Sequence, residues 1–241
     1  MAHSANYEIL THDTGHNGEV HPSAICRYLQ ETADSQMRAD GPTYRELIDA
    51  GYSFVLSRIN VQLYASLHAY DQITVQTWAY DPPRGASFER YYRLYRGNEL
   101  IAEAGTVWAL LNLNTMELCR IGAVELNYGT GEPLPINMRF RLPSLEFEDA
   151  GTRTVRYSDV DVNNHMNNTR YPDMLCDFVP DIDTLRVTGI QLHYVAEAPL
   201  GETLTVKRAM TEEDGHPVYW FETLRSDGKC NIRARIDAET L

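Results

Sequence analysis

The chain has 241 residues, of which 43% are hydrophobic and 23% are charged, as expected for a folded protein with a sizeable apolar core. Its formal net charge of −13 disfavours nucleic-acid binding, which requires a basic face for the phosphates, and docking on an anionic membrane surface. The length suits one large domain or two of about 120 residues.

The N-terminal residues MAHSANYEIL lack the charged start and apolar core of a signal peptide, and no apolar run reaches membrane-spanning length. The cysteines are far apart and form no CxxC pair, which is typical of reduced thiols in a cytoplasmic protein. They are Cys26, Cys119, Cys176 and Cys230. His12, His16 and His21 are close in sequence, but no neighbouring residue completes a ligand set, so we predict no metal and no cofactor.

The first half of the chain begins with helical patterns. In VHPSAICRYLQETA (20–33), apolar residues recur at helical spacing and Pro22 suits the first turn. Gly41 and Pro42 interrupt this pattern, and TYRELIDAG (43–51) predicts a shorter helix.

Strand patterns rich in β-branched and aromatic residues come next. They cover residues 57–65, 71–80, 87–96 and 99–113, with Gly97-Asn98 as a hairpin turn. The following stretch, YGTGEPLPINMRFRLPSL (128–145), contains Pro and Gly and is typical of a linker.

The same order then begins again. We predict a strand over 152–160 and a short helix over 167–179. Four further strands are predicted over 186–195, 202–210, 217–225 and 229–237, with hairpin turns at Asp214-Gly215 and Asp227-Gly228.

The two halves align as copies of one unit. Val20 aligns with Met166, an offset of 146 residues (166 − 20), and Asp71 aligns with Glu202, an offset of 131 residues (202 − 71). Each unit is a helix followed by an antiparallel sheet that can wrap it. The predicted fold is therefore an α+β tandem repeat, with a first domain at 1–127, a linker at 128–150 and a second domain at 151–241.

One short segment, DVDVNNHMNNTRY (159–171), concentrates small polar residues before the second helix. Asn and Asp favour turns, so the segment is either a loop or a catalytic cluster. The alignment sets Asp161 against Gly15, Asn163 against Asn17, His165 against Glu19 and Glu197 against Ser66. A turn required only for folding is expected in both halves, so a carboxylate–imidazole cluster in one half favours a function.

The doubled unit and the DVNNHMNN segment resemble the acyl-acyl carrier protein (ACP) thioesterases, double-hotdog enzymes of the plant and bacterial fatty-acid pathway. The resemblance covers most of the chain, including the TWAY, VWALLNLNT and HYVAEA stretches. It implies a tandem hotdog fold and hydrolysis of acyl-ACP to free fatty acid in fatty acid biosynthesis. It also implies that ACP is the partner and that the first half houses part of the acyl tunnel.

The resemblance further implies the site residues. The catalytic Asp, Asn and His of the family, and its downstream acidic residue, correspond to Asp161, Asn163, His165 and Glu197. Plant members commonly follow that Glu with Cys, whereas this chain has Ala198. Pro172, early in the second helix, removes one N–H and could delay or bend the regular helix.

These residue types suit thioester hydrolysis. Backbone N–H groups at the start of the second helix can stabilise the charge that develops on the thioester oxygen. Asp161 can act as general base or as nucleophile, and Asn163 can orient water or the carbonyl. His165, held in one tautomer by Glu197, can protonate the leaving thiolate or position the carboxylate.

The alternatives are an acyl-CoA thioesterase, a hydratase on the same scaffold, and a non-catalytic hotdog protein that binds acyl thioesters. Chain-length preference is left open, and a homodimer is allowed.

The carrier protein is acidic, so local patches of arginine are candidate docking surfaces for it. For most of the arginines concerned, surface solubility is the simpler role. The candidates are Arg84, Arg90, Arg93, Arg96, Arg139, Arg141, Arg153 and Arg156.

Overall fold

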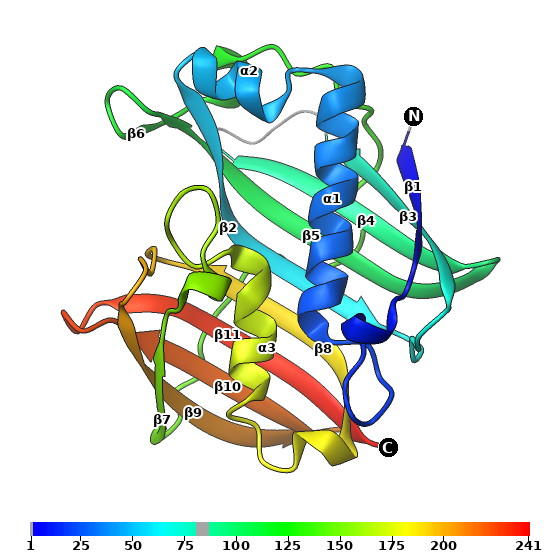
Figure 1. The fold of residues 1–241 in the computed structure, drawn as a ribbon, viewed down its shortest axis with the longest axis vertical. Helices are drawn as coiled ribbons and strands as arrows, with labels where there is room; N and C mark the ends of the chain where they lie inside the picture. The colour runs from blue at the N-terminus through cyan, green and yellow to red at the C-terminus, as the bar shows by residue number, and fades with distance from the viewer. Residues whose placement is uncertain (1, 81–86) are drawn as a thin grey trace.

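The computed structural model describes residues 2–80 and 87–241 and consists of two similar halves (Figure 1). The first half contains the helices α1 (Pro22–Asp40) and α2 (Tyr44–Asp49) and the strands β1 (His3–Glu8), β2 (Tyr52–Leu63), β3 (Gln72–Ala79), β4 (Ser87–Arg96), β5 (Glu99–Asn112) and β6 (Glu117–Cys119). The second half contains α3 (Tyr171–Cys176) and the strands β7 (Glu148–Thr154), β8 (Leu185–Tyr194), β9 (Thr203–Glu213), β10 (His216–Leu224) and β11 (Cys230–Thr240).

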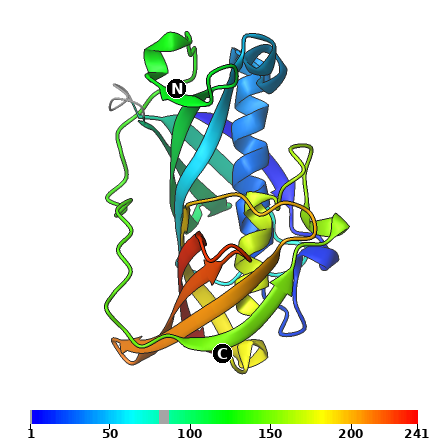
Figure 2. The same ribbon diagram turned by 90° about the vertical axis from the view of Figure 1, so that its left-hand side faces the viewer.

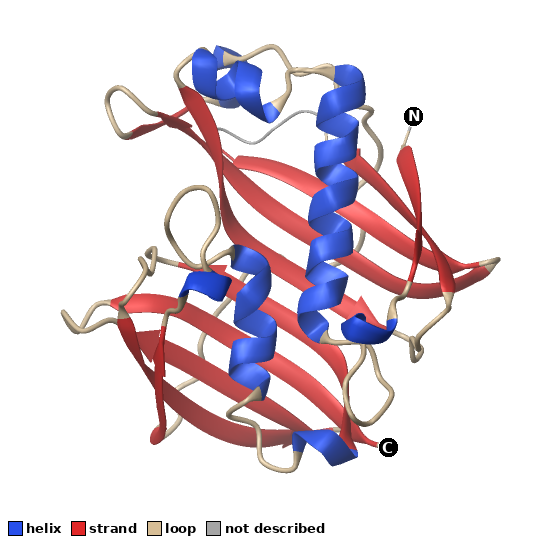
Figure 3. Cartoon of the chain, viewed as in Figure 1, coloured by secondary structure: helices blue, strands red, loops and turns tan. Residues whose placement is uncertain are grey.

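The strands of both halves form one antiparallel sheet in the order β1-β3-β4-β5-β2-β8-β11-β10-β9-β7, with β6 paired to β5. The halves meet where β2 pairs with β8, from Arg58 opposite His193 to Gln62 opposite Gly189. Helices α1 and α3 lie on the same side of the sheet, which curves around them (Figure 3). The predicted α+β fold of two tandem hotdog units is therefore confirmed.

Helix α1 begins as predicted and is longer than predicted. Pro22 occupies its first turn, and the helix continues to Asp40, beyond the predicted end at residue 33. It ends at Gly41, whose φ of 67° is easily adopted by glycine. The backbone N–H of Ser23, in the first turn, donates to Oδ1 of Asp173 in α3 at 2.8 Å. The second half thus supplies a carboxylate cap for the main helix of the first half.

Two boundaries in the second half differ from the prediction. The strand predicted at 152–160 lies at Glu148–Thr154, so the end of the predicted linker (128–150) belongs to β7. Its pairing with β9 shifts register between Asp149 and Gly151, an irregularity that a strict alternation of residues does not reveal. The helix predicted at 167–179 starts as a 3₁₀ turn and becomes regular only in the shorter α3, whose first turn contains Pro172.

Residues 120–147 cross the face of the sheet that is opposite the helices (Figure 2). Leu134 packs with Trp78 on the first half, and Phe140 packs with Trp220 on the second, at 6.3 Å between ring centroids. The segment predicted as a linker is therefore packed against the sheet along its length.

Candidate active site

The loop before each main helix has the same backbone conformation in both halves. Equivalent contacts recur 146 residues apart. The β-bridge Thr14↔Val20 of the first loop corresponds to Val160↔Met166 of the second. The hydrogen bond from Gly15 N–H to Glu19 O corresponds to the one from Asp161 N–H to His165 O. A left-handed residue also recurs, Gly18 with φ 81° and Asn164 with φ 62°. Because the first loop folds without the Asp–His cluster, the turn itself does not require these side chains.

The Asp161 carboxylate is fixed by its own loop. Oδ1 accepts the backbone N–H of Asn163 at 2.9 Å, and Oδ2 accepts the side-chain amide of Asn167 at 3.2 Å. These bonds hold the carboxylate beside Asn163, just ahead of the helix start.

His165 and Glu197 come together from separate segments. Met166 N–H donates to Ala198 O at 2.8 Å and so ties the loop to the segment that contains Glu197. The imidazole Nε2 of His165 consequently lies 3.7 Å from Glu197 Oε1. The Glu197 side chain is 72% exposed, against 21% for His165, so the carboxylate lies at the solvent end of the pair. The structure thus places Asp161, Asn163 and His165 in one loop and Glu197 beside His165, and no described contact joins the Asp161 carboxylate to the imidazole.

The helix start that follows the cluster is a single 3₁₀ turn, Asn168–Arg170. Asn167 caps it, since its Oδ1 accepts the N–H of Thr169 at 2.9 Å, and its carbonyl accepts the N–H of Arg170 at 2.9 Å. The N–H of Asn168 donates to no described residue. It is therefore the donor of this turn that is available to an oxyanion.

Sequence reasoning missed one contact to the site. The hydroxyl of Tyr44, in α2 of the first half, donates to Asn163 Oδ1 at 3.1 Å. A residue 119 positions away offers no periodic or motif signal that could link it to the cluster.

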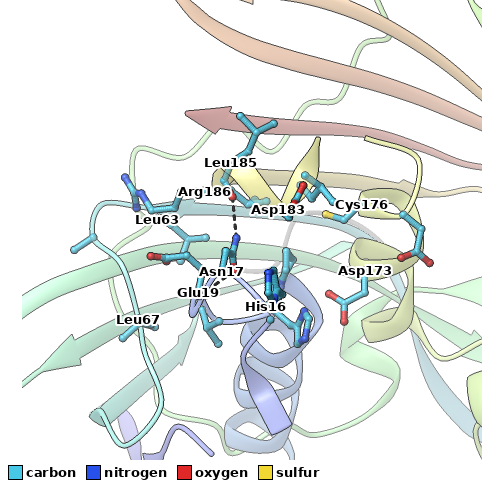
Figure 4. A pocket seen from close by; sticks show the side chains of 18 residues that line it. His16, Asn17, Glu19, Leu63, Leu67, Asp173, Cys176, Asp183, Leu185 and Arg186 are labelled. Atoms are coloured by element: carbon cyan, nitrogen blue, oxygen red, sulfur yellow. Dashed lines mark hydrogen bonds between the residues drawn. The ribbon is translucent and has the colours of Figure 1, made fainter. Parts of the chain in front are cut away.

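The first half is not free of carboxylate–imidazole contacts, contrary to the sequence comparison. Glu19, which occupies the position of His165, lies with Oε1 3.8 Å from His68 Nε2, so in the first half the carboxylate is on the loop and the imidazole is on the segment that follows β2. This loop lines a cavity of about 390 Å³ (Figure 4). The first loop nevertheless has Gly15 where the second has Asp161, and therefore lacks the candidate base or nucleophile.

A smaller cavity of about 20 Å³ is lined by residues of both halves. Asn168, Thr169 and Tyr194 come from the second half, and the other lining residues come from α1 and the sheet of the first half. These first-half residues are Cys26, Leu29, Gln30, Leu56, Ile59, Tyr92, Thr106 and Trp108.

The four cysteines are free thiols, and among the described residues none of them forms a hydrogen bond with His165. Burial raises the pKa of Cys26 to about 12 and the pKa of Cys230 to about 11, and it raises the pKa of Cys176 further still. The thiolate is the nucleophilic form, so these buried thiols are poor nucleophiles at neutral pH. Within residues 2–80 and 87–241, no group of three or more His, Cys, Asp or Glu side chains is arranged to hold a metal ion.

Four of the seven basic candidates within the described residues are buried or paired with carboxylates. Arg84 lies outside the described residues, and Arg90 is only 3% exposed, so its assignment to a surface patch is wrong. Three others form ion pairs, namely Arg93 with Glu103, Arg96 with Asp71 and Glu99, and Arg153 with Asp159. Arg139, Arg141 and Arg156 are exposed.

Comparisons with known proteins agree with this architecture. Models of the acyl-ACP thioesterase N-terminal and C-terminal domains match residues 1–125 and 146–239. Chloroplastic palmitoyl-acyl carrier protein thioesterases of Cuphea hookeriana and Arabidopsis thaliana are each 22% identical, over 87% and 86% of this chain. The matches cover 55% and 54% of those proteins, so the chain spans about half the length of these relatives.

Solved structures share the fold over the whole chain. An acyl-ACP thioesterase from Bacteroides thetaiotaomicron superposes with a TM-score of 0.89 at 24% identity, covering 99% of this chain and 98% of the other. The 12:0-ACP thioesterase from Umbellularia californica superposes with a TM-score of 0.82 at 18% identity, covering 100% and 94%. At these identities the likeness establishes the double-hotdog fold.

Proposed function

Because the chain belongs to the acyl-ACP thioesterase family, we propose that it hydrolyses the thioester of acyl-ACP and releases a free fatty acid during fatty acid biosynthesis. One observation carries this proposal. Two loops with the same backbone precede the two main helices, yet only the second has Asp161 and His165, followed by the free N–H of Asn168, where the first has Gly15 and Glu19. Such asymmetry has no structural cause in the turn, so it points to chemistry.

In the proposed reaction Asp161 removes a proton from the water that attacks the thioester carbonyl carbon, with Asn163 orienting the reacting group. In the alternative, Asp161 attacks this carbon itself, and after loss of the thiol a water hydrolyses the acyl–Asp161 anhydride to release the fatty acid and restore the carboxylate. The N–H of Asn168 donates to the oxyanion that forms. The C–S bond then breaks, and His165 supplies the proton that converts the leaving thiolate to a thiol. Glu197, 3.7 Å from the imidazole, holds its orientation.

The division of the chain into domains at 1–127 and 151–241, joined by 128–150, is part of this proposal. In it, the second domain supplies the cluster and the first supplies the acyl pocket. The small cavity between Asn168 and α1 supports that arrangement.

A cytoplasmic location and a homodimer are also proposed from the sequence. The described residues contain no helix with the length and apolar character needed to cross a membrane. The Cuphea hookeriana and Arabidopsis thaliana thioesterases are chloroplastic, and fractionation of the source cells would decide the location of this protein.

The test of the proposed function is thiol release from matched acyl-ACP and acyl-CoA thioesters of several chain lengths. We expect faster turnover of acyl-ACP and a preference that weakens as salt increases, because charged partners are screened. A preference for acyl-CoA at low salt would favour the acyl-CoA thioesterase alternative. Tight binding without turnover of any thioester would favour a non-catalytic binding protein.

A further inference from the structure

The cavity of about 390 Å³ is related by the internal symmetry of the chain to the smaller cavity that Asn168 lines (Figure 4). Helix residues of the two halves correspond at an offset of 146 residues, and strand residues correspond at an offset of 131 residues. Arg58 thus corresponds to Gly189 (189 − 58), and Gln62 likewise corresponds to His193 (193 − 62). The first and last residue pairs of the β2–β8 ladder are therefore exchanged, so the pairing of the halves obeys this symmetry.

Four wall positions of the two cavities correspond at these offsets. Pro22 in the larger cavity occupies the position of Asn168 in the smaller one. The three other positions have smaller side chains in the larger cavity, which leave it open. They are Cys176 in place of Gln30, Leu63 in place of Tyr194 and Val187 in place of Leu56.

The floor of the larger cavity is apolar. It is formed by buried side chains of both halves, namely Pro22, Leu63, Leu67, Cys176 and Leu185. Its volume of about 390 Å³ is within the range of about 300–1,000 Å³ that small-molecule pockets span. Burial of an alkyl chain against such a floor is favourable, because apolar surface is removed from water on both sides.

The polar side of this cavity is acidic. Glu19 lines it with a side chain that is only 12% exposed, and no described residue donates a hydrogen bond to its carboxylate, which lies 3.8 Å from His68. The other lining carboxylates are Asp173, Asp177 and Asp183. Among the described lining residues Arg186 is the one arginine or lysine, and it pairs with Glu239 at 2.7 Å. An anionic head would therefore meet like charges here, whereas a cationic head would be attracted.

Going beyond the proposed thioesterase function, we propose that this cavity binds a single-chain amphiphile with an ammonium head, such as a primary alkyl amine. The alkyl chain packs on the apolar floor, and the ammonium donates to the Glu19 carboxylate. The acidic lining disfavours a free fatty acid. The site binds without hydrolysis, since Gly15 occupies the position that corresponds to Asp161.

The test is isothermal titration calorimetry at neutral pH with octylamine, octanol and octanoate, each below the concentration at which it forms micelles. We expect octylamine to bind wild type in a one-to-one complex and at least about tenfold tighter than octanol, the effect of one hydrogen bond to a charged group. Octanoate should bind more weakly than octanol, because its carboxylate meets the acidic lining. Equal affinities for the three compounds would overturn the proposal.

Glu19→Gln keeps the shape of the side chain and removes its charge. It should lower the affinity for octylamine by about tenfold and leave the affinity for octanol unchanged. Asp161→Asn is the matched control, because it removes a carboxylate from the equivalent loop of the second half and should leave both affinities unchanged. An effect on octylamine in Asp161→Asn and none in Glu19→Gln would place the amine in the candidate active site and refute the proposal.

Ala65→Phe tests the position of the alkyl chain and covers the case in which Glu19→Gln fails to fold. Ala65 lines the cavity from the segment after β2 and is half-buried, so a larger side chain can fill the space. The affinities for octylamine and octanol should both fall by about tenfold or more. Unchanged binding of both compounds to folded Ala65→Phe would contradict the proposal. The heat of binding requires no thioester cleavage, so this outcome is independent of the proposed enzymatic function.

Discussion

The Tyr44 hydroxyl donates a hydrogen bond to Asn163 Oδ1 at 3.1 Å, so α2 of the first half contacts the proposed catalytic loop of the second. Helix α2 is itself fixed by a capping box, in which the side chains and backbone N–H groups of Thr43 and Glu46 bond reciprocally. The amide of Asn163 is therefore oriented by the other half of the molecule.

Replacement of Tyr44 by Phe should lower kcat/KM for thioester cleavage by about fivefold, because a neutral hydrogen bond contributes about 1 kcal/mol. Tyr64→Phe is a matched control, since its hydroxyl bonds Glu103 at the surface, and it should leave turnover unchanged. Wild-type turnover in Tyr44→Phe would show that the contact does not position Asn163.

Asp161→Ala and His165→Ala should each lower kcat by about a hundredfold or more, the usual effect of removing a general acid or base. Both side chains lie in a loop whose backbone forms in the first half without them, so the melting temperature should change little. Glu19→Ala, at the position equivalent to His165, should keep nearly full activity. A loss in Glu19→Ala as large as that in His165→Ala would mean that the first loop shares the chemistry.

A variant in which all four cysteines are replaced by Ala or Ser should keep turnover within a small factor of wild type, provided that it folds. Ala198 occupies the position of the thiol common in plant relatives, and the thiol of Cys176 is buried with a raised pKa. Acylation trapped on Cys176 in mass spectrometry, together with inactivity of a folded Cys176→Ala variant, would reverse this assignment.

Asp13 should make folding stability sensitive to acid. Burial raises the pKa of its carboxyl, but hydrogen bonds from Tyr28 and Arg27 outweigh burial and hold the pKa below its ordinary value. Because the folded-state pKa is the lower one, the unfolded chain takes up more protons as the pH falls. The contribution of Asp13 is therefore complete above an unfolded-state pKa of about 4 and is lost as the pH falls through the folded-state value.

Asp13→Asn should accordingly lower the free energy of unfolding by about 2 kcal/mol at pH 7, measured by urea denaturation, and by much less at a pH of about 3. Asp149→Asn removes an exposed carboxylate 3.5 Å from Lys207 and should have little effect at either pH. An equal loss at both pH values would indicate that packing of Asp13, and not its charge, stabilises the loop.

The repeat and most helices and strands were predictable because their signals are local. Helical spacing identified the start of α1, and turn pairs such as Gly97-Asn98 located hairpins. Strand β1 was missed because HSANYE is polar and pairs with β3 only at the sheet edge. The β7 boundary was wrong because its register shift at Asp149 and Gly151 breaks the alternation.

The candidate site was predicted in part for the same reason. Asp161, Asn163 and His165 lie within one short segment, whereas the contacts of Tyr44 and the Glu19–His68 pair depend on tertiary packing. Sequence also assigned Arg90 to the surface, since a charged residue in an alternating strand usually faces water. Its burial depends on contacts with Gln36 of α1 and Thr77 of the neighbouring strand β3, which the sequence pattern of β4 does not reveal.

The pairing of β2 with β8 makes the chain equivalent to a dimer whose copies cannot dissociate. Val61 and Ile190 lie opposite each other at this junction, both almost completely buried, so either half alone would expose an apolar strand edge. In a symmetric dimer every substitution appears twice. Here the covalent connection removes that constraint, so one copy can specialise in reaction chemistry while the other adapts its interior to the substrate.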